Sequence, residues 1–270
     1  MHAKALTWWT ILRICLEERL VYRGDFALGT LMRFLPIITQ IFLWGSIFTA
    51  VKGDIAGYNY HDFIAYYLLS MVGRAFSSMP GLASGISRDI RDGTVKKFLI
   101  QPIDMVGFLF LMRVAHKLVY YGVALAPFAL VFYLCRGFFP PMPDGATIAA
   151  FVLSLVMAFM LGYFLEAAIG LYGFWFLEIN SLMWIYMLFN FFFSGHMFPL
   201  DMLPPPFSYI VQLQPLQYLA YFPAAVWLGK IEGAALRQGL WLELFWVIFF
   251  FLLCRFAYSR GVRRYSGFGG

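Results

Sequence analysis

Residues 146–173 read ATIAAFVLSLVMAFMLGYFLEAAIGLYG, and this stretch decides the fold class. Glu166 is its single charged residue. A helix needs about 20 apolar residues to cross the hydrocarbon core of a bilayer, and this stretch is longer than that. Its apolar residues form a continuous run, which favours a spanning helix over a barrel strand with alternating polarity.

The rest of the chain follows the same pattern. Of its 270 residues, 62% are hydrophobic and 13% are charged. A soluble domain carries about 25% charged residues, so this composition excludes an ordinary soluble enzyme and a disordered chain. We predict an all-α integral membrane protein, one undivided domain over residues 1–270, with six transmembrane helices. The predicted spans are residues 26–51, 61–85, 106–135, 146–173, 179–199 and 237–258.

Lysine and arginine are distributed unequally between the two sides of these spans. Segments 1–24, 86–104 and 255–264 hold twelve of them, whereas the loops on the opposite side hold four. Cytoplasmic segments carry the excess of positive charge in membrane proteins. We therefore expect both termini and the 86–104 loop to be cytoplasmic, and the net charge of +6 reflects topology rather than nucleic-acid binding.

Two further segments are not simple spans. Within residues 1–24, Trp8, Leu12, Leu16 and Leu20 recur every four residues, which predicts an amphipathic helix lying on the membrane or packed on a partner. Residues 194–223 are apolar but broken by prolines. This segment either enters the outer leaflet and returns, as an external re-entrant segment, or lies on the surface as a cap.

The loop of residues 86–104 reads ISRDIRDGTVKKFLIQPID and holds seven of the 34 charged residues. Helical spacing places Ile86, Ile90 and Phe98 on one side, and Asp89, Asp92 and Lys96 on another. Gly93 permits a bend, and Pro102 is expected to end the helix. A short charged helix of this kind docks into a groove of another protein, or it is a solvated loop that only sets topology.

Ionisable residues inside the spans are candidate functional residues because they are costly in lipid. Arg74 lies on a polar stripe that lines a path for an anionic or amphipathic substrate, or it packs closely and pairs with Glu166. Glu166 itself shares a small-residue stripe with Ala158, Gly162, Gly170 and Gly173. Arg113, His116, Lys117 and Tyr120 are expected to snorkel at the cytoplasmic interface. The polar stripe comprises Ser70, Arg74, Ser77, Ser78, Gly81, Ser84 and Arg88.

Phe189, Phe191, Phe192 and Phe193 follow one another closely and either stack on a substrate or face lipid. The chain has no phosphate-binding GxxxxGK[ST] loop, no HExxH and no GxSxG element. Its four histidines and three cysteines show no ligand spacing. We therefore expect no catalysis, no metal and no cofactor in this chain.

Three features together resemble permeases of the ABC transporter type 2 family. The first is the charged-Gly-Thr-then-Pro loop, in which this chain has Val95, Lys96 and Lys97 where the family often has leucine and an acidic residue. The second is the pattern after the fifth span, and the third is the tail GVRRYSGFGG. The residues that carry the first two are Arg88, Asp89, Asp92, Gly93, Thr94 and Pro102, and Ser194, Gly195, Phe198, Pro199, Leu200, Pro204 and Pro215.

The resemblance implies a half-transporter of a prokaryotic cytoplasmic membrane that pairs with a second permease, identical or related. It implies an exporter of a hydrophobic, amphipathic or lipid-linked substrate. Separate cytosolic ATPase subunits would bind ATP and Mg and dock on the loop. The implied docking residues are Arg88, Asp89, Arg91, Asp92, Gly93, Thr94, Lys96 and Lys97. A self-sufficient channel or ion-driven carrier, and a membrane anchor for a cytosolic enzyme, are the alternatives.

Overall fold

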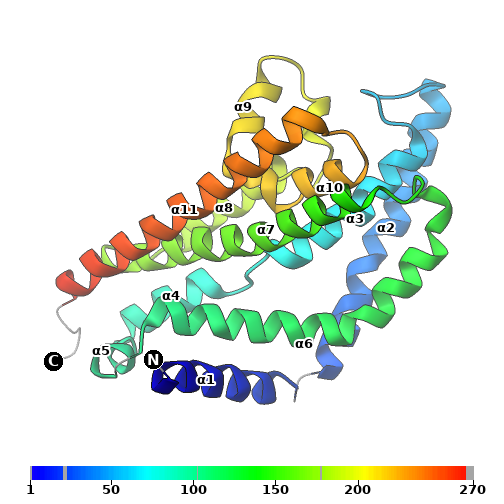
Figure 1. Cartoon of the computed structure of the whole chain (residues 1–270). Coiled ribbons are helices and arrows are strands. Elements are labelled where there is room, and N and C mark those ends of the chain that lie inside the picture. The colour runs from blue at the N-terminus through cyan, green and yellow to red at the C-terminus, as the bar shows by residue number, and fades with distance from the viewer. Residues whose placement is uncertain (1, 21–22, 102, 177, 266–270) are drawn as a thin grey trace.

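The computed structural model describes residues 2–20, 23–101, 103–176 and 178–265, and these residues fold into helices (Figure 1). Within them, one β-bridge between Ile55 and Tyr58 is the only strand-like pairing. The α-helices are α1 His2–Leu20, α2 Arg23–Val51, α3 Tyr60–Ser77, α4 Leu82–Arg91, α5 Lys96–Ile100, α6 Met105–Leu134, α7 Gly145–Leu171, α8 Asn180–Phe193, α9 Phe207–Leu213, α10 Tyr221–Trp227 and α11 Gly233–Arg264. Short 3-10 helices are η1 Arg136–Phe138, η2 Tyr172–Phe174, η3 Leu200–Met202 and η4 Pro215–Leu219.

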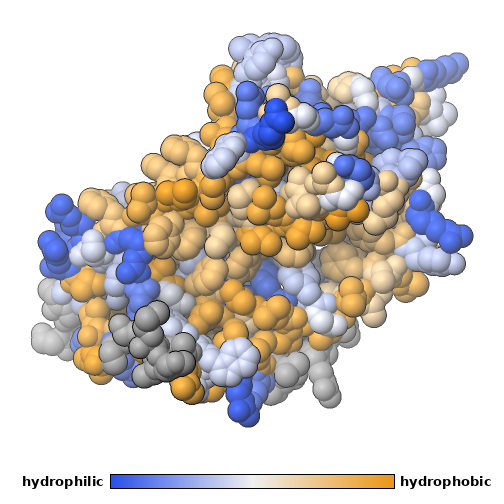
Figure 2. Space-filling view, in the orientation of Figure 1, coloured by the Kyte–Doolittle hydropathy of each residue, from blue (hydrophilic) through white to orange (hydrophobic). Residues whose placement is uncertain are grey.

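Among the described residues, four helical stretches are long and apolar enough to cross a membrane: Phe34–Val51, Met105–Leu134, Gly145–Phe174 and Gly233–Arg264. Helix α8 is apolar but has only 14 residues. Figure 2 shows hydrophobic residues over the middle of the visible face, with hydrophilic residues gathered mainly towards its ends. The chain is therefore a multi-pass membrane protein.

The segment that we predicted as one span over residues 61–85 is two helices. Helix α3 ends at Ser77, α4 begins at Leu82, and Gly81 between them has a φ of +71°. Pro80 and Gly81 explain the interruption, because proline removes a backbone donor and glycine accepts a left-handed conformation. Likewise, the helix predicted over residues 179–199 ends at Phe193, just before the left-handed Gly195.

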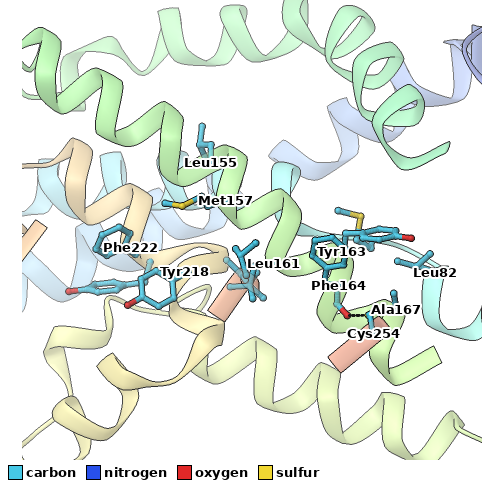
Figure 3. Packing of buried hydrophobic residues seen from close by; sticks show 14 of the residues in the cluster. Leu82, Leu155, Met157, Leu161, Tyr163, Phe164, Ala167, Tyr218, Phe222 and Cys254 are labelled. Carbon is cyan, nitrogen blue, oxygen red and sulfur yellow. Dashed lines mark hydrogen bonds between the residues drawn. The ribbon is translucent and has the colours of Figure 1, made fainter. Parts of the chain in front are cut away.

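Helix α7 is the centre of the bundle and contacts α3, α4, α10 and α11. Its glycines allow backbone to touch backbone: a Cβ at Gly162 would lie 2.1 Å from the carbonyl oxygen of Ser77. A Cβ at Gly170 would lie 2.9 Å from Cα of Ala83. The glycines of the small-residue stripe therefore pack tightly against the α3–α4 backbone. Figure 3 shows the apolar core along the same helix, where Leu161 lies close to Tyr218 and Tyr163 lies close to Leu82.

The segment predicted to be external, residues 194–223 and called the external segment below, folds back into the bundle through η4 and leads into the buried helix α10. Helix α3 holds its irregular backbone in place. The Tyr66 hydroxyl donates to the carbonyl of Gly195, and the Ser77 hydroxyl donates to the carbonyl of Leu219 at 2.9 Å. Protein groups thus satisfy non-helical backbone that has left the solvent. Helix α9, by contrast, exposes most of its apolar side chains, so only part of the segment lies on the surface.

Helix α1 lies along α6 (Figure 1). The indole of Trp8 would be 3.1 Å from a Cβ at Gly107, in the first turn of α6. That turn is capped by Asp104, whose carboxylate accepts a hydrogen bond from the Gly107 amide at 2.7 Å. Asp104 also pairs with Arg255 of α11 at 2.6 Å. The predicted Trp8–Leu12–Leu16 face therefore packs, half-buried, against this chain's own helix; the side chain of Leu20 lies outside the described residues.

Replacing Gly162 with alanine tests the α7–α3 contact. The added methyl group cannot fit without backbone movement, so we expect the free energy of unfolding to fall by about 1–3 kcal/mol. Gly122→Ala in α6 is the matched control because a Cβ there meets no atom within 4 Å. Thermal unfolding of both purified variants in detergent gives the comparison. Equal stability of the two variants would refute the close packing.

Candidate functional site

The charged loop is a helical corner between α4 and α5, and Asp89 holds it together. The Asp89 carboxylate accepts a hydrogen bond from the Thr94 hydroxyl at 2.6 Å and lies 3.4 Å from Lys97 Nζ. The Asp89 carbonyl accepts from the amide of Val95 at 2.9 Å. Gly93 forms the turn with a φ of +77°, as its predicted bend requires. The predicted stop at Pro102 lies outside the described residues.

The buried face of this corner agrees with the helical spacing, because Ile86, Ile90 and Phe98 are buried against the bundle. Of the residues predicted on the other side, Asp92 and Lys96 are exposed, as is Arg88, whereas Asp89 is only partly exposed. The exposed face also carries an apolar group, because Ile100 is 82% exposed. A charged surface with an apolar side chain at its edge suits contact with another protein.

A second loop adjoins this corner. Glu178, in the connection between η2 and α8, lies 3.8 Å from the guanidinium of Arg91. Arg91 also contacts the carboxylate of Asp92 at 3.3 Å. The two loops are far apart in the sequence, so no local pattern brings Glu178 and Arg91 together. The pair enlarges the exposed charged surface from one loop to two.

The break between α3 and α4 is surrounded by ionisable side chains from neighbouring helices. Lys117 Nζ of α6 donates to the carbonyls of Ala75 and Ser78, the latter at 2.8 Å. Arg113 donates to the carbonyl of Pro80 at 3.0 Å. The Glu166 carboxyl of α7 faces the backbone of Met79 and has Arg113 and Lys117 as charged neighbours.

These side chains have a clear physical task. A helix that stops inside an apolar bundle leaves carbonyl and amide groups without partners, and each such group is costly there. Lys117 is buried, so our expectation that it snorkels to the interface is wrong. The residues Met79, Pro80 and Gly81 carried the signal for this break, since adjacent Pro and Gly mark an interruption.

Arg74 and Glu166 are not brought together as an ion pair in the described structure. The Arg74 guanidinium instead contacts the imidazole of His196, in the external segment. Ser70 and Ser77 are not part of an exposed polar stripe, because both are buried. Ser70 donates to the carbonyl of Tyr67, and Ser77 donates to the carbonyl of Leu219. The residues of the predicted stripe that remain at least partly exposed are Arg74, Ser78, Gly81, Ser84 and Arg88.

The external-segment residues build a tight turn next to Arg74. The carbonyl of Ser194 accepts from the amide of Tyr221 at 2.9 Å. Gly195 has a φ of +78°, and a Cβ there would lie 2.5 Å from Cβ of Tyr221. The remaining residues of the predicted pattern shape the chain: Pro199 precedes η3, Pro204 is exposed, Pro215 begins η4 and Phe198 is half-buried.

An apolar groove of about 610 Å³ lies between α7, α8, α11 and the external segment. Its lining includes Leu165, Phe189, Phe193, Val211 and Phe250. The other two phenylalanines of the α8 run, Phe191 and Phe192, are exposed. Two of the four aromatic rings thus line a groove, and two lie on the outer surface.

The ordered loop corner, the helix break and the long apolar helices agree with what the comparisons show. A family model described as ABC-2 family transporter protein matches residues 34–269. The chain belongs to the ABC-2 transporter family. A search of curated proteins finds no match. Members of this family are the transmembrane, non-catalytic component of an ABC transporter, which works with an ATPase partner.

Lys117→Met removes the charged cap of the break while keeping an unbranched side chain. One buried and one partly buried carbonyl lose their donor, so we expect the free energy of unfolding to fall by about 1–3 kcal/mol. Lys96→Met, on the exposed face of the corner, is the control and should leave stability within about 0.5 kcal/mol. Thermal unfolding in detergent measures both. A Lys117→Met protein as stable as the control would show that the cap contributes nothing.

Proposed function

We propose that this ABC-2 protein is the permease subunit of an ATP-driven exporter of a hydrophobic, amphipathic or lipid-linked substrate. One observation carries the proposal: the exposed charged corner continues through α4 into the capped break and from there into α3. Movement of the corner therefore acts directly on the break between α3 and α4. No nucleic acid takes part in this function, and ATP hydrolysis belongs to the partner rather than to this chain.

The corner is the proposed docking site for the ATPase. Asp89, Thr94 and Lys97 hold its shape, Gly93 makes its turn, and Arg88, Arg91, Asp92 and Lys96 present charge to a partner. ATP and Mg would be bound by that partner, whose closure would push on the corner. Because the buried face of α4 packs on the backbone of α7 at Gly170, a push would be transmitted as a rigid shift of α4.

The exposed face of α3 and α4 is the proposed translocation path. It carries Arg74 beside His196 and continues through Ser78 and Ser84 to Arg88. A polar face of this kind is costly against lipid, so a second permease, identical or related, would cover it. Arg74 gives the path a positive charge suited to an anionic head group.

The membrane arrangement follows from these assignments. Together α3 and α4 form one interrupted span, and α8 forms a short one, which brings the four long helices to six spans. Both termini and the corner face the cytoplasm of a prokaryotic cell. Helix α1 lies at the cytoplasmic interface beside α6, and the external segment is re-entrant, with η4 and α10 inside the protein.

Charge reversal on the corner tests the docking site. The double variant Asp92→Lys with Lys96→Glu changes exposed groups only, whereas reversal of Asp89 would disrupt the corner itself. We expect an ATPase that co-purifies with the wild-type chain from native membranes to be lost from the variant. Asp54→Lys, on the loop between α2 and α3, should retain it. Mass spectrometry of the gently extracted complexes provides the measurement; a wild-type chain that transports without any ATPase would contradict the proposal.

Arg74→Leu tests the path. Reconstituted transport should fall at least about tenfold, since loss of one charge-assisted contact with the substrate costs about 1.4 kcal/mol or more. ATPase co-purification should be unchanged, because the corner is intact. Transport at the wild-type rate would mean that Arg74 is not part of the path and would favour a chain that serves only as an anchor.

A further inference from the structure

Glu243 is a buried carboxyl group that no part of the proposed function uses. It lies on α11, is 0% exposed, and neither of its carboxyl oxygens has a hydrogen-bond partner in the described part of the chain. The hydroxyl of Ser154 on α7 faces it, is also fully buried, and likewise lacks a partner among the described residues. Three polar atoms with unused bonding capacity thus meet between two of the longest apolar helices.

Among the described residues, polar groups rather than cations face Glu243. On α7 the polar group that faces it is Ser154, and on η4 of the external segment it is the phenol of Tyr218. Tyr218 is 1% exposed and packs on Phe222 with ring centroids 5.0 Å apart (Figure 3). The nearest basic residue along α11 is Arg237, nearly two turns away and exposed. No lysine or arginine of the described chain forms a salt bridge with Glu243.

An ionised carboxylate in such a place is unfavourable. Transfer of an isolated charge from water into an apolar interior costs far more than the net stability of a protein domain, and a group in this situation neutralises instead. The neutral carboxylic acid gains an O–H donor, and the Ser154 hydroxyl offers an oxygen to accept it. One added proton therefore removes the buried charge and lets the carboxyl O–H donate to the Ser154 oxygen.

We propose that Glu243 is a closed proton-binding site at the contact of α7, α11 and the external segment. A proton from water forms the O–H bond on the carboxylate, and the site has no other ligand. The proton exchanges with water only when η4, carrying Tyr218, moves away from α11. This inference concerns this chain alone and does not depend on the proposed transport activity.

Infrared spectroscopy of the purified protein in lipid tests the proposal directly. A protonated carboxyl group has its own carbonyl band, and that band shifts when the proton is replaced by deuterium. We expect Glu243→Gln to lose one such band. The exposed Glu232→Gln, at the start of the same helix, is the matched control and should keep it. An unchanged spectrum in Glu243→Gln would overturn the proposal.

Two further readouts keep the test decisive if Glu243→Gln folds poorly. Ser154→Ala removes the facing hydroxyl and should shift the band to higher frequency; an unshifted band would show that the pair does not form. After transfer of the wild-type protein into D2O, the shift should develop slowly, because exchange requires the contact to open. A shift complete on mixing would mean that the site is open to water, which contradicts a closed site.

Discussion

The arrangement depends on how a break in a helix is stabilised away from water. The chain leaves helical geometry at residues 78–81, and Lys117, Arg113 and Glu166 supply the polar contacts that the backbone there lacks. Without those side chains the segment would have to remain helical or move to a surface. Because they come from α6 and α7, the break also fixes where these two helices lie relative to α3 and α4.

Close backbone contact with α7 holds the break between α3 and α4 rigidly on the side opposite the polar contacts. Gly162, Gly170 and Gly173 leave no room between α7 and the α3–α4 chain, so the break sits between a polar clamp and a small-residue surface. The external segment adds a third constraint, since Ser77, the last residue of α3, donates to Leu219. The end of α3 thereby contacts both the external segment and the central helix α7. It is also connected, through α4, to the exposed charged corner between α4 and α5.

Much of this could be predicted from sequence, and the failures have physical reasons. The apolar run of α7, its glycine stripe, the two faces of the charged loop and the bend at Gly93 follow from periodicity and residue type. The partners of Arg74 and Lys117 could not be predicted in this way. Counting spans assumes that each helix is continuous and that charged side chains near its ends lie at the membrane interface. Once Pro80 and Gly81 interrupt the span, Lys117 has carbonyls to bind inside the bundle. Glu178 and Arg91 meet only through the fold, which no local pattern encodes.

The capped break also constrains how the chain is made. Residues 78–81 are synthesised before α6 and long before α7, so at first neither Lys117 nor Glu166 exists to meet them. The carbonyls of the newly made α3–α4 segment must therefore stay hydrated, at a membrane interface or within the insertion machinery, until these partners are made. This segment is buried late in assembly, when the glycines of α7 pack against its backbone.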